Sequence, residues 1–314
     1  MPTAVSRALF ERVRTKAARQ YGVVSRPQLV ALGASPGWIR GRREHGDLVR
    51  VQPQVFRVVG FADSWHGHAS AACLQCGRAA VLSHSTAARL RGLELPDQEA
   101  CIEVTVPRSM KAPALDAVKV HRATRLTSAD RALFENLPVT TVARTLVDLA
   151  SRLDDVAIAR LVDDAILRGI VQLPVLRSTI VRLARKGCAG PARVERALRP
   201  WLLGRLESHA EAEVLRRLLV WHLPPPLPQY QVALGGGLVA RVDFAWPAHR
   251  LALEVDGFSA HDGPRKFVAD RQRWNRLRAA GWDVVQVTIR ELREDPSAVW
   301  RVLRGRLRAV DLPE

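Results

Sequence analysis

The feature that most constrains the fold is a pair of adjacent apolar segments near the C-terminus that contain carboxylates. Apolar and polar residues alternate over residues 239–246, which is the period of a β-strand. Residues 251–256 form a more continuous apolar run, as expected of an interior strand. Asp243 and Glu254 are therefore predicted near the ends of neighbouring strands, with Asp256 beyond Glu254 on the same face.

Carboxylates this close together repel one another when they are partly buried. A divalent cation or a raised pKa relieves the repulsion. Hard oxygen ligands suit Mg²⁺, so the predicted cofactor is Mg²⁺ or Mn²⁺, held by Asp243 and Glu254. A further carboxylate, Glu211, lies three residues after Ser208, so a capping box explains this glutamate from the residues alone.

The segments around these strands predict the element order α-β-β-β-α-β-α. A helix begins at Ser208 and a Gly235–Gly237 turn joins the first two strands into a hairpin. The other predicted elements are a strand over residues 229–234, a basic helix over 264–280, a strand over 283–288 and a helix over 291–308.

Residues 205–310 resemble the DUF559 group, which is similar to very-short-patch-repair endonucleases of the PD-(D/E)XK superfamily. The resemblance is carried by Glu211, the run Arg-Val-Asp-Phe-Ala-Trp-Pro, the run Leu-Glu-Val-Asp-Gly with His261, and the segments 270–275 and 281–284. It implies that Asp243 and Glu254 hold Mg²⁺ with help from Glu211. The family's usual lysine, two residues after the glutamate, is replaced by Asp256.

The predicted activity is Mg²⁺-dependent hydrolysis of a DNA phosphodiester. His261 is the candidate base or proton donor because its ordinary pKa suits either task, and Lys266 is a more distant candidate. Lys266, Arg271 and Arg273 of the basic helix are predicted to contact the DNA backbone. The alternative is a transcriptional regulator or antitoxin that binds DNA without cutting it. A nuclease acting on RNA is left open.

The charge balance points to the same class of partner. The chain of 314 residues has 48 Lys and Arg against 31 Asp and Glu, a net charge of +17. A basic surface favours nucleic acid as the partner. A high-GC genome would explain the preference for arginine but not the excess of positive charge. The chain has no apolar run long enough to span a membrane and no signal peptide, so we expect a cytoplasmic protein.

Residues 1–60 are predicted to form a winged helix-turn-helix. Three helices are expected over residues 4–20, 25–32 and 35–43, followed by a hairpin of residues 48–51 and 55–59. The third helix carries Arg40, Arg42 and Arg43, the predicted DNA contacts. Residues 10–58 resemble the N-terminal domain of AbiEi-family antitoxins, which repress transcription in type IV toxin–antitoxin systems. The resemblance implies a cognate toxin as a protein partner, and a repair protein is the alternative partner. The sequence does not determine the oligomeric state, and a dimer is one of the states left open.

Residues 61–200 are predicted to be a mixed α/β region without identifiable chemistry. A helical segment over residues 66–90 and two strands over 101–107 and 117–122 are expected, followed by helices. Cys73 and Cys76 have the local spacing of a zinc site, but without a second pair they are interpreted as core residues. His66, His68 and His84 lack carboxylates at helical spacing and are interpreted as surface or capping residues. The whole chain is thus predicted to be an α/β protein of three regions, 1–60, 61–200 and 201–314.

Overall fold

The computed structural model describes residues 4–96, 101–111, 115–256 and 264–308, with side chains omitted for 264–270. The protein mixes helices with three β-sheets of three, five and four strands. It divides into two compact units, residues 1–194 and 195–314, and the division falls within helix α9 (Ala189–Leu198).

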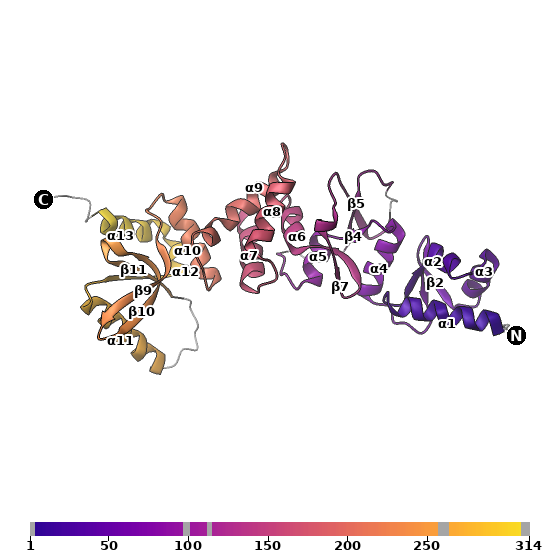
Figure 1. The fold of residues 1–314 in the computed structure, drawn as a ribbon, viewed down its shortest axis with the longest axis horizontal. Coiled ribbons are helices and arrows are strands. Elements are labelled where there is room, and N and C mark those ends of the chain that lie inside the picture. The colour runs from indigo at the N-terminus through magenta and orange to yellow at the C-terminus, as the bar shows by residue number, and fades with distance from the viewer. Residues whose placement is uncertain (1–3, 97–100, 112–114, 257–263, 309–314) are drawn as a thin grey trace. The chain divides into compact units, whose positions relative to one another are not determined.

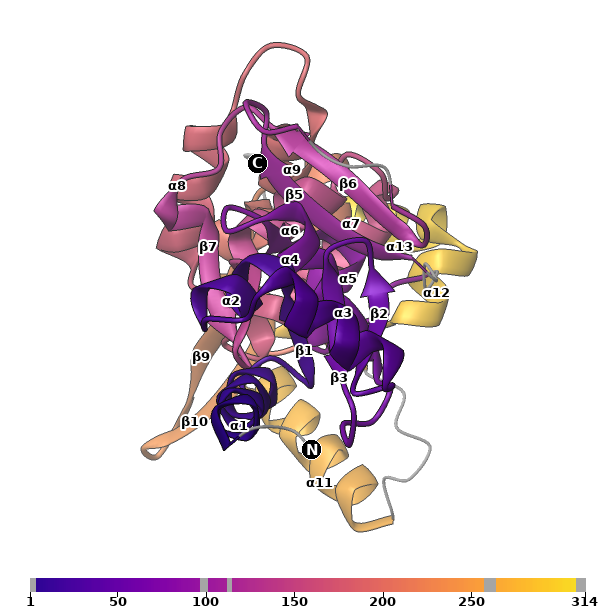
Figure 2. The same cartoon turned by 90° about the vertical axis from the view of Figure 1, so that its right-hand side faces the viewer.

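The first part of the N-terminal unit is a small sheet surrounded by helices (Figure 2). The sheet has the order β1-β3-β2, and both pairings are antiparallel. Ser25 and Ser35 cap the starts of α2 and α3. Each side chain accepts a hydrogen bond from the backbone N–H three residues later, that of Gln28 and that of Trp38. The elements are α1 (Ala4–Ala18), β1 (Val23–Ser25), α2 (Arg26–Ala31), α3 (Pro36–Glu44), β2 (Leu48–Gln52) and β3 (Val55–Val58).

The second part of this unit is built on a five-stranded sheet of order β6-β5-β4-β8-β7. The pairs β5–β6 and β4–β8 are parallel, whereas β4–β5 and β7–β8 are antiparallel. The elements are α4 (Trp65–Cys76), β4 (Val81–Leu82), α5 (His84–Leu90), β5 (Ile102–Pro107), β6 (Val118–Ala123), β7 (Arg131–Phe134) and β8 (Leu137–Thr140).

Helices complete the N-terminal unit. They are α6 (Val142–Leu149), α7 (Asp155–Leu167), α8 (Leu173–Leu183) and the beginning of α9. Helix α4 packs against β1, β2 and β3, so the two sheets belong to one compact unit. Cys73 and Cys76 belong to α4 and lie in the buried core, which confirms their interpretation as core residues. Burial raises the pKa of the Cys76 thiol to about 11.

The C-terminal unit contains a four-stranded sheet of order β12-β11-β10-β9. Strands β9, β10 and β11 are antiparallel neighbours, and β12 pairs with β11 in parallel. Figure 1 shows α11 on one side of the sheet and α10, α12 and α13 on the other. The elements are α10 (His209–Val220), β9 (Leu227–Gly235), β10 (Leu238–Trp246), β11 (Leu251–Asp256), α11 (Pro264–Ala279), β12 (Asp283–Thr288), α12 (Ile289–Glu294) and α13 (Pro296–Arg308).

Three local features differ from the sequence-based expectations. The last helix is two helices, because Pro296 lacks an N–H and restricts Asp295, whose backbone leaves the helical region. The helical segment of residues 66–90 is interrupted by β4, and strands β1, β7 and β8 were not predicted. Along β10 the alternation ends at Asp243, and the next three residues are all buried.

In the part of the chain that the structure describes, no helix combines the length and apolar character required to cross a membrane.

Candidate functional site

Asp243 and Glu254 lie opposite each other on the two central strands of the C-terminal sheet. The antiparallel register pairs Phe244 with Leu253, and one step further along it places Asp243 beside Glu254. On the next strand, β12, Gln286 is paired with Glu254. The sheet therefore brings together, as predicted, the two carboxylates that are eleven positions apart in the printed sequence.

Asp243 is half-buried and hydrogen-bonded to the neighbouring strand. Its Oδ2 accepts a hydrogen bond of 2.8 Å from the backbone N–H of Val255. Burial raises the pKa of Asp243, and the Val255 N–H and the nearby positive charge of Arg273 only partly counteract this rise. The carboxyl group therefore binds a proton more readily than an exposed aspartate, and a nearby positive charge would favour its ionised form.

Glu211 at the start of α10 both caps its helix and faces the sheet. Its Oε1 accepts a hydrogen bond of 2.8 Å from the Ser208 hydroxyl, and its Oε2 accepts one of 2.9 Å from the backbone N–H of Glu207. Ser208 in turn caps the helix by accepting from the Glu211 N–H. Burial raises the pKa of Glu211, and the nearby charge of Asp243 raises it further. Glu211 therefore forms part of the helix cap and also lies close to Asp243.

Gln229 on β9 connects Glu211 to Asp243. Its Nε2 donates a hydrogen bond of 2.8 Å to Glu211 Oε2, and a hydrogen bond from the same side chain lowers the pKa of Asp243. Continuing the β9–β10 register between Tyr230 and Pro228 places Gln229 opposite Asp243. Gln229 has a left-handed backbone with a φ of 50°. Such strained conformations of a non-glycine residue cluster at functional sites.

Arg273 of α11 reaches the second carboxylate. Its Nη2 lies 2.9 Å from Glu254 Oε2, and its Nη1 donates a hydrogen bond of 2.7 Å to the backbone carbonyl of Arg241. Glu254 is 8% exposed, so its charge depends on a partner of this kind. Arg273 is predicted to contact the DNA backbone, and this contact stays a prediction; in the structure the side chain reaches Glu254 in the candidate site.

The other predicted site residues lie outside this group. Asp256 is exposed at the end of β11, and Arg271 is exposed on α11. His261 and the side chain of Lys266 lie outside the described residues.

The donor set fits a hard cation, although the carboxylates do not form a compact ligand cluster. All candidate ligands are oxygens, and Gln229 Oε1 is buried without a hydrogen-bond partner in the described part of the chain. However, Glu211, Asp243 and Glu254 do not bring three ligand atoms within 4.8 Å of one another. Among the described residues, only His84, Glu103 and His121 of the N-terminal unit do so. Bound water would have to complete a Mg²⁺ site between the carboxylates, as it usually does for this ion.

The three arginines predicted to contact DNA differ in their surroundings. Arg40 and Arg43 are exposed on α3. Arg42 is held inside the unit, because its Nη1 lies 2.8 Å from Asp47 and its guanidinium lies over the rings of Phe10 and Trp38. The DNA contact of Arg42 stays a prediction, and in this conformation the side chain is engaged elsewhere.

Sequence reasoning missed Gln229 and misjudged His84. Gln229 carries no local signal, because its role depends on the register of β9 and β10. His84 was interpreted as a surface or capping residue, but it is buried and only 7% exposed. Its carboxylate neighbour Glu103 comes from β5, so a search at helical spacing could not find it.

His66 and His68 are half-exposed and lie near Glu135 and Asp63, consistent with their interpretation as surface residues.

Comparison with known proteins identifies relatives of the sequence but no activity. No protein-family model matches the chain. Two uncharacterized proteins of Mycobacterium tuberculosis, MT2308 and Rv2248, are each 39% identical to it over 101 residues. The matched segment makes up 32% of this chain and 37% of each relative, so the chain spans less than half the length of these proteins.

One solved structure is similar over a larger share of the chain. The crystal structure of the RV2827C protein from Mycobacterium tuberculosis aligns with a TM-score of 0.39 and 20% sequence identity. The alignment covers 61% of this chain and 81% of that chain. At these values the similarity carries no argument about function.

Proposed function

We propose that the C-terminal unit is a Mg²⁺-dependent DNA endonuclease. The observation that carries the proposal is the position of Asp243 opposite Glu254 on the central strands. Burial raises the pKa of Asp243, so a nearby divalent cation would stabilise its ionised form. The all-oxygen donor set and the resemblance of these motifs to DUF559 support the same reading. The net charge of +17 suits a polyanionic substrate.

Asp243 and Glu254 would hold the ion, with Glu211 contributing through its position beside Asp243. Bound Mg²⁺ would supply an activated water and neutralise charge on the scissile phosphate. Gln229 orients the site by holding Glu211 while its unpaired Oε1 offers a further oxygen donor. Arg273 pairs with Glu254 at 2.9 Å and would present positive charge to a phosphate.

The N-terminal helices support DNA binding by a second part of the protein. Three helices followed by the β2–β3 hairpin are the elements of a winged helix-turn-helix, and α3 would be its recognition helix. Arg40 and Arg43 are the exposed cations of α3 that would face DNA. Under this proposal the module binds DNA while the C-terminal unit cuts it.

The test is cleavage of supercoiled plasmid by the full chain with Mg²⁺, with Mn²⁺ and with EDTA. We expect metal-dependent nicking that is lost in Asp243→Asn and in Glu254→Gln, since both variants keep the side-chain shape and remove the charge. Glu294→Gln is the matched control, because Glu294 is an exposed carboxylate of the same unit that pairs with Arg290. Nicking that survives both site variants would contradict the proposal.

The second candidate function is a transcriptional regulator that binds DNA without cutting it. The observation that favours it is the contact of Arg273 with Glu254. Because the guanidinium already balances the charge of this predicted metal ligand, the site does not need a metal ion for that purpose. This function predicts a shift of a promoter fragment that does not depend on metal, together with an intact plasmid in every metal condition. Loss of that shift in Arg40→Gln with Arg43→Gln would assign the binding to α3.

A further inference from the structure

A cavity of about 290 Å³ in the N-terminal unit is lined largely by cationic side chains. It lies among α5, α6, the end of β6 and the segment after α8. Four of its lining residues are the arginines Arg122, Arg125, Arg144 and Arg185. Asp148 is the only carboxylate that lines it among the described residues. The cavity therefore has a strong excess of positive charge.

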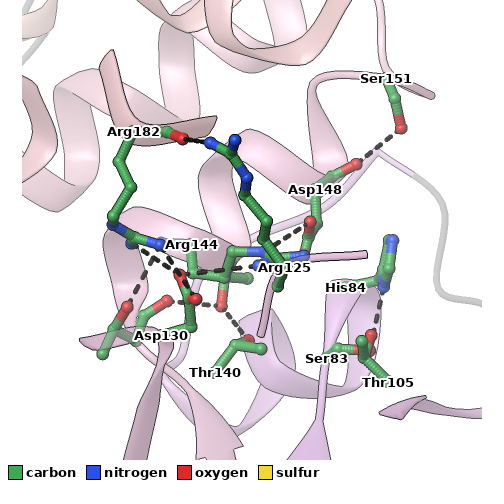
Figure 3. A network of polar contacts seen from close by, with 12 residues as sticks. Ser83, His84, Thr105, Arg125, Asp130, Thr140, Arg144, Asp148, Ser151 and Arg182 are labelled. Atoms are coloured by element: carbon green, nitrogen blue, oxygen red, sulfur yellow. Dashed lines mark hydrogen bonds and ion pairs between the residues drawn. The ribbon is translucent and has the colours of Figure 1, made fainter. Parts of the chain in front are cut away.

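The charge of Asp148 is already matched by Arg144. Arg144 is buried, and its Nε lies 2.9 Å from Asp148 Oδ1 (Figure 3). Its Nη1 also donates a hydrogen bond of 2.7 Å to the carbonyl of Arg125, which fixes the guanidinium at the wall of the cavity.

The other three arginines have only neutral partners in the part of the chain that the structure describes. Arg122 and Arg125 donate to the backbone carbonyls of Arg108 and Arg182 at 2.5 and 2.9 Å. Arg185 donates to the hydroxyl of Thr124. These contacts direct the guanidinium groups without neutralising them, so three positive charges at the cavity have no carboxylate partner among the described residues.

His84 can act as a further donor at this cavity. The hydroxyl of Thr105 donates to Ser83 Oγ at 2.7 Å, and in one tautomer of the ring Ser83 donates its own hydroxyl hydrogen to His84 Nδ1, 3.0 Å away (Figure 3). Nδ1 is then the acceptor of the ring, and Nε2 carries the proton. His84 lines the cavity and thus offers it an N–H group.

The surroundings of His84 favour its neutral form. Its backbone is left-handed with a φ of 49°, and its ring stacks on His121 with the centroids 3.7 Å apart. Burial, followed by the charge of the neighbouring His121, lowers the pKa of His84 to about 3. A strained, buried and uncharged histidine at a cationic cavity is costly for folding, which is a typical sign of a functional site.

A metal is a poorer occupant than an anion. The trio His84, Glu103 and His121 has metal-ligand spacing, but Glu103 is saturated by other partners. Its Oε2 accepts two hydrogen bonds from Ser85, and its Oε1 contacts His121 at 2.9 Å and Arg152 at 2.5 Å. A cation there would have to displace Arg152 beside several arginines, against the local charge.

We propose that this cavity binds the phosphate monoester group of a small ligand of about mononucleotide size. Arginine forks and a fixed imidazole N–H match phosphate oxygens, which only accept hydrogen bonds. The volume lies near the lower end of the range for small-molecule pockets, which suits a ligand of this size. The site belongs to the N-terminal unit and does not depend on the proposed nuclease activity.

The test is isothermal titration calorimetry of the full chain with inorganic phosphate, adenosine 5′-monophosphate and adenosine. We expect binding of the monophosphate, competition by inorganic phosphate and no binding of adenosine. Arg125→Gln with Arg185→Gln should weaken the monophosphate by roughly tenfold or more, because charge-assisted hydrogen bonds are lost. His84→Phe should weaken it similarly, since the ring remains while the N–H is lost.

The matched control is Arg177→Gln, which removes an exposed positive charge from α8 outside the cavity. It should leave the monophosphate affinity unchanged. Circular dichroism of every variant identifies any that fails to fold. If the double variant fails to fold, the monophosphate affinity of the single variant Arg185→Gln, which changes an exposed side chain, is the test. Equal binding of adenosine, equal weakening by Arg177→Gln, or binding of Zn²⁺ in place of phosphate would each overturn the proposal.

Discussion

At the scale of single residues, Gln229 shows how one side chain organises the candidate site. It donates to Glu211 and Asp243, two carboxyl groups whose pKa values are raised mainly by burial. Without this amide, the two carboxyl groups would lose a shared donor in a partly buried setting. The left-handed backbone of Gln229 is a separate cost, because a φ of 50° is unfavourable for any residue with a Cβ.

We predict that Gln229→Ala lowers the free energy of unfolding by about 1–3 kcal/mol, the typical effect of depriving a buried acceptor of its donor. Gln229→Gly should be less harmful by roughly 1 kcal/mol, because glycine tolerates the left-handed backbone. Urea denaturation of the full chain measures both values. Gln231→Ala is the control, an exposed glutamine on the same strand. Equal effects of Gln229→Ala and Gln231→Ala would show that the amide does not connect the carboxyl groups.

At the scale of elements, helix α3 separates structural from outward-facing arginines within a single turn. Arg42 contacts Asp47 and donates to Ser6 at 3.1 Å, and it lies over two aromatic rings. Arg43 and Arg40 are exposed. Under the proposed function, the helix is anchored by Arg42 and presents Arg40 and Arg43 to DNA.

We predict that Arg40→Gln with Arg43→Gln weakens DNA binding and reduces its dependence on salt, since fewer counterions are released. The folded state should be little affected. Arg42→Gln should instead lower the free energy of unfolding by roughly 1–2 kcal/mol, through loss of a partly buried ion pair and its contacts with the rings. Fluorescence anisotropy at several salt concentrations and urea denaturation measure the two effects. A weakened affinity with unchanged stability in Arg42→Gln would reverse the assignment.

At the scale of the whole molecule, the two units are expected to respond to pH in opposite directions. In the N-terminal unit, burial alone would raise the pKa of Glu103, but hydrogen bonds from His121 and Ser85 outweigh it and lower the pKa to about 2. The stability that Glu103 contributes is present above its unfolded pKa, near 4, and is lost as the pH falls toward 2. In the C-terminal unit, Asp243 and Glu211 have raised pKa values. Their protonated forms favour the folded state, so stability falls as the pH rises from about 4 through the raised values.

We predict two thermal transitions of the full chain that move apart with pH. Between pH 7 and pH 4 the transition of the C-terminal unit should rise relative to that of the N-terminal unit, and Asp243→Asn should reduce this rise. Scanning calorimetry measures both transitions. Leu146→Ala and Leu215→Ala assign them, because each removes a fully buried side chain from one unit. Transitions that shift together at every pH would contradict the prediction.

The sequence by itself determined the local elements wherever their signal is local. Period-2 alternation identified β10, and the continuous apolar run identified β11 as an interior strand. Ser25 and Ser35 marked the starts of α2 and α3 because their side chains satisfy N–H groups of the adjacent turn. The adjacency of Asp243 and Glu254 followed from two strands joined by a short connection. Each of these features depends on residues close together in the chain.

Only the tertiary structure decided which distant side chains meet. The packing of α11 beside the sheet brings Arg273 to Glu254, a contact that the sequence did not predict. Gln229 joined the site through strand register, and His84 met Glu103 and His121 because α5, β5 and β6 pack together. The periodicity of the sequence does not predict these contacts, because they depend on the order of the strands in each sheet. The pKa shifts in turn depend on the burial that the tertiary structure creates. The composition predicts a polyanionic partner, which stays a prediction, whereas the fold decides which arginines are exposed and which are held by other side chains.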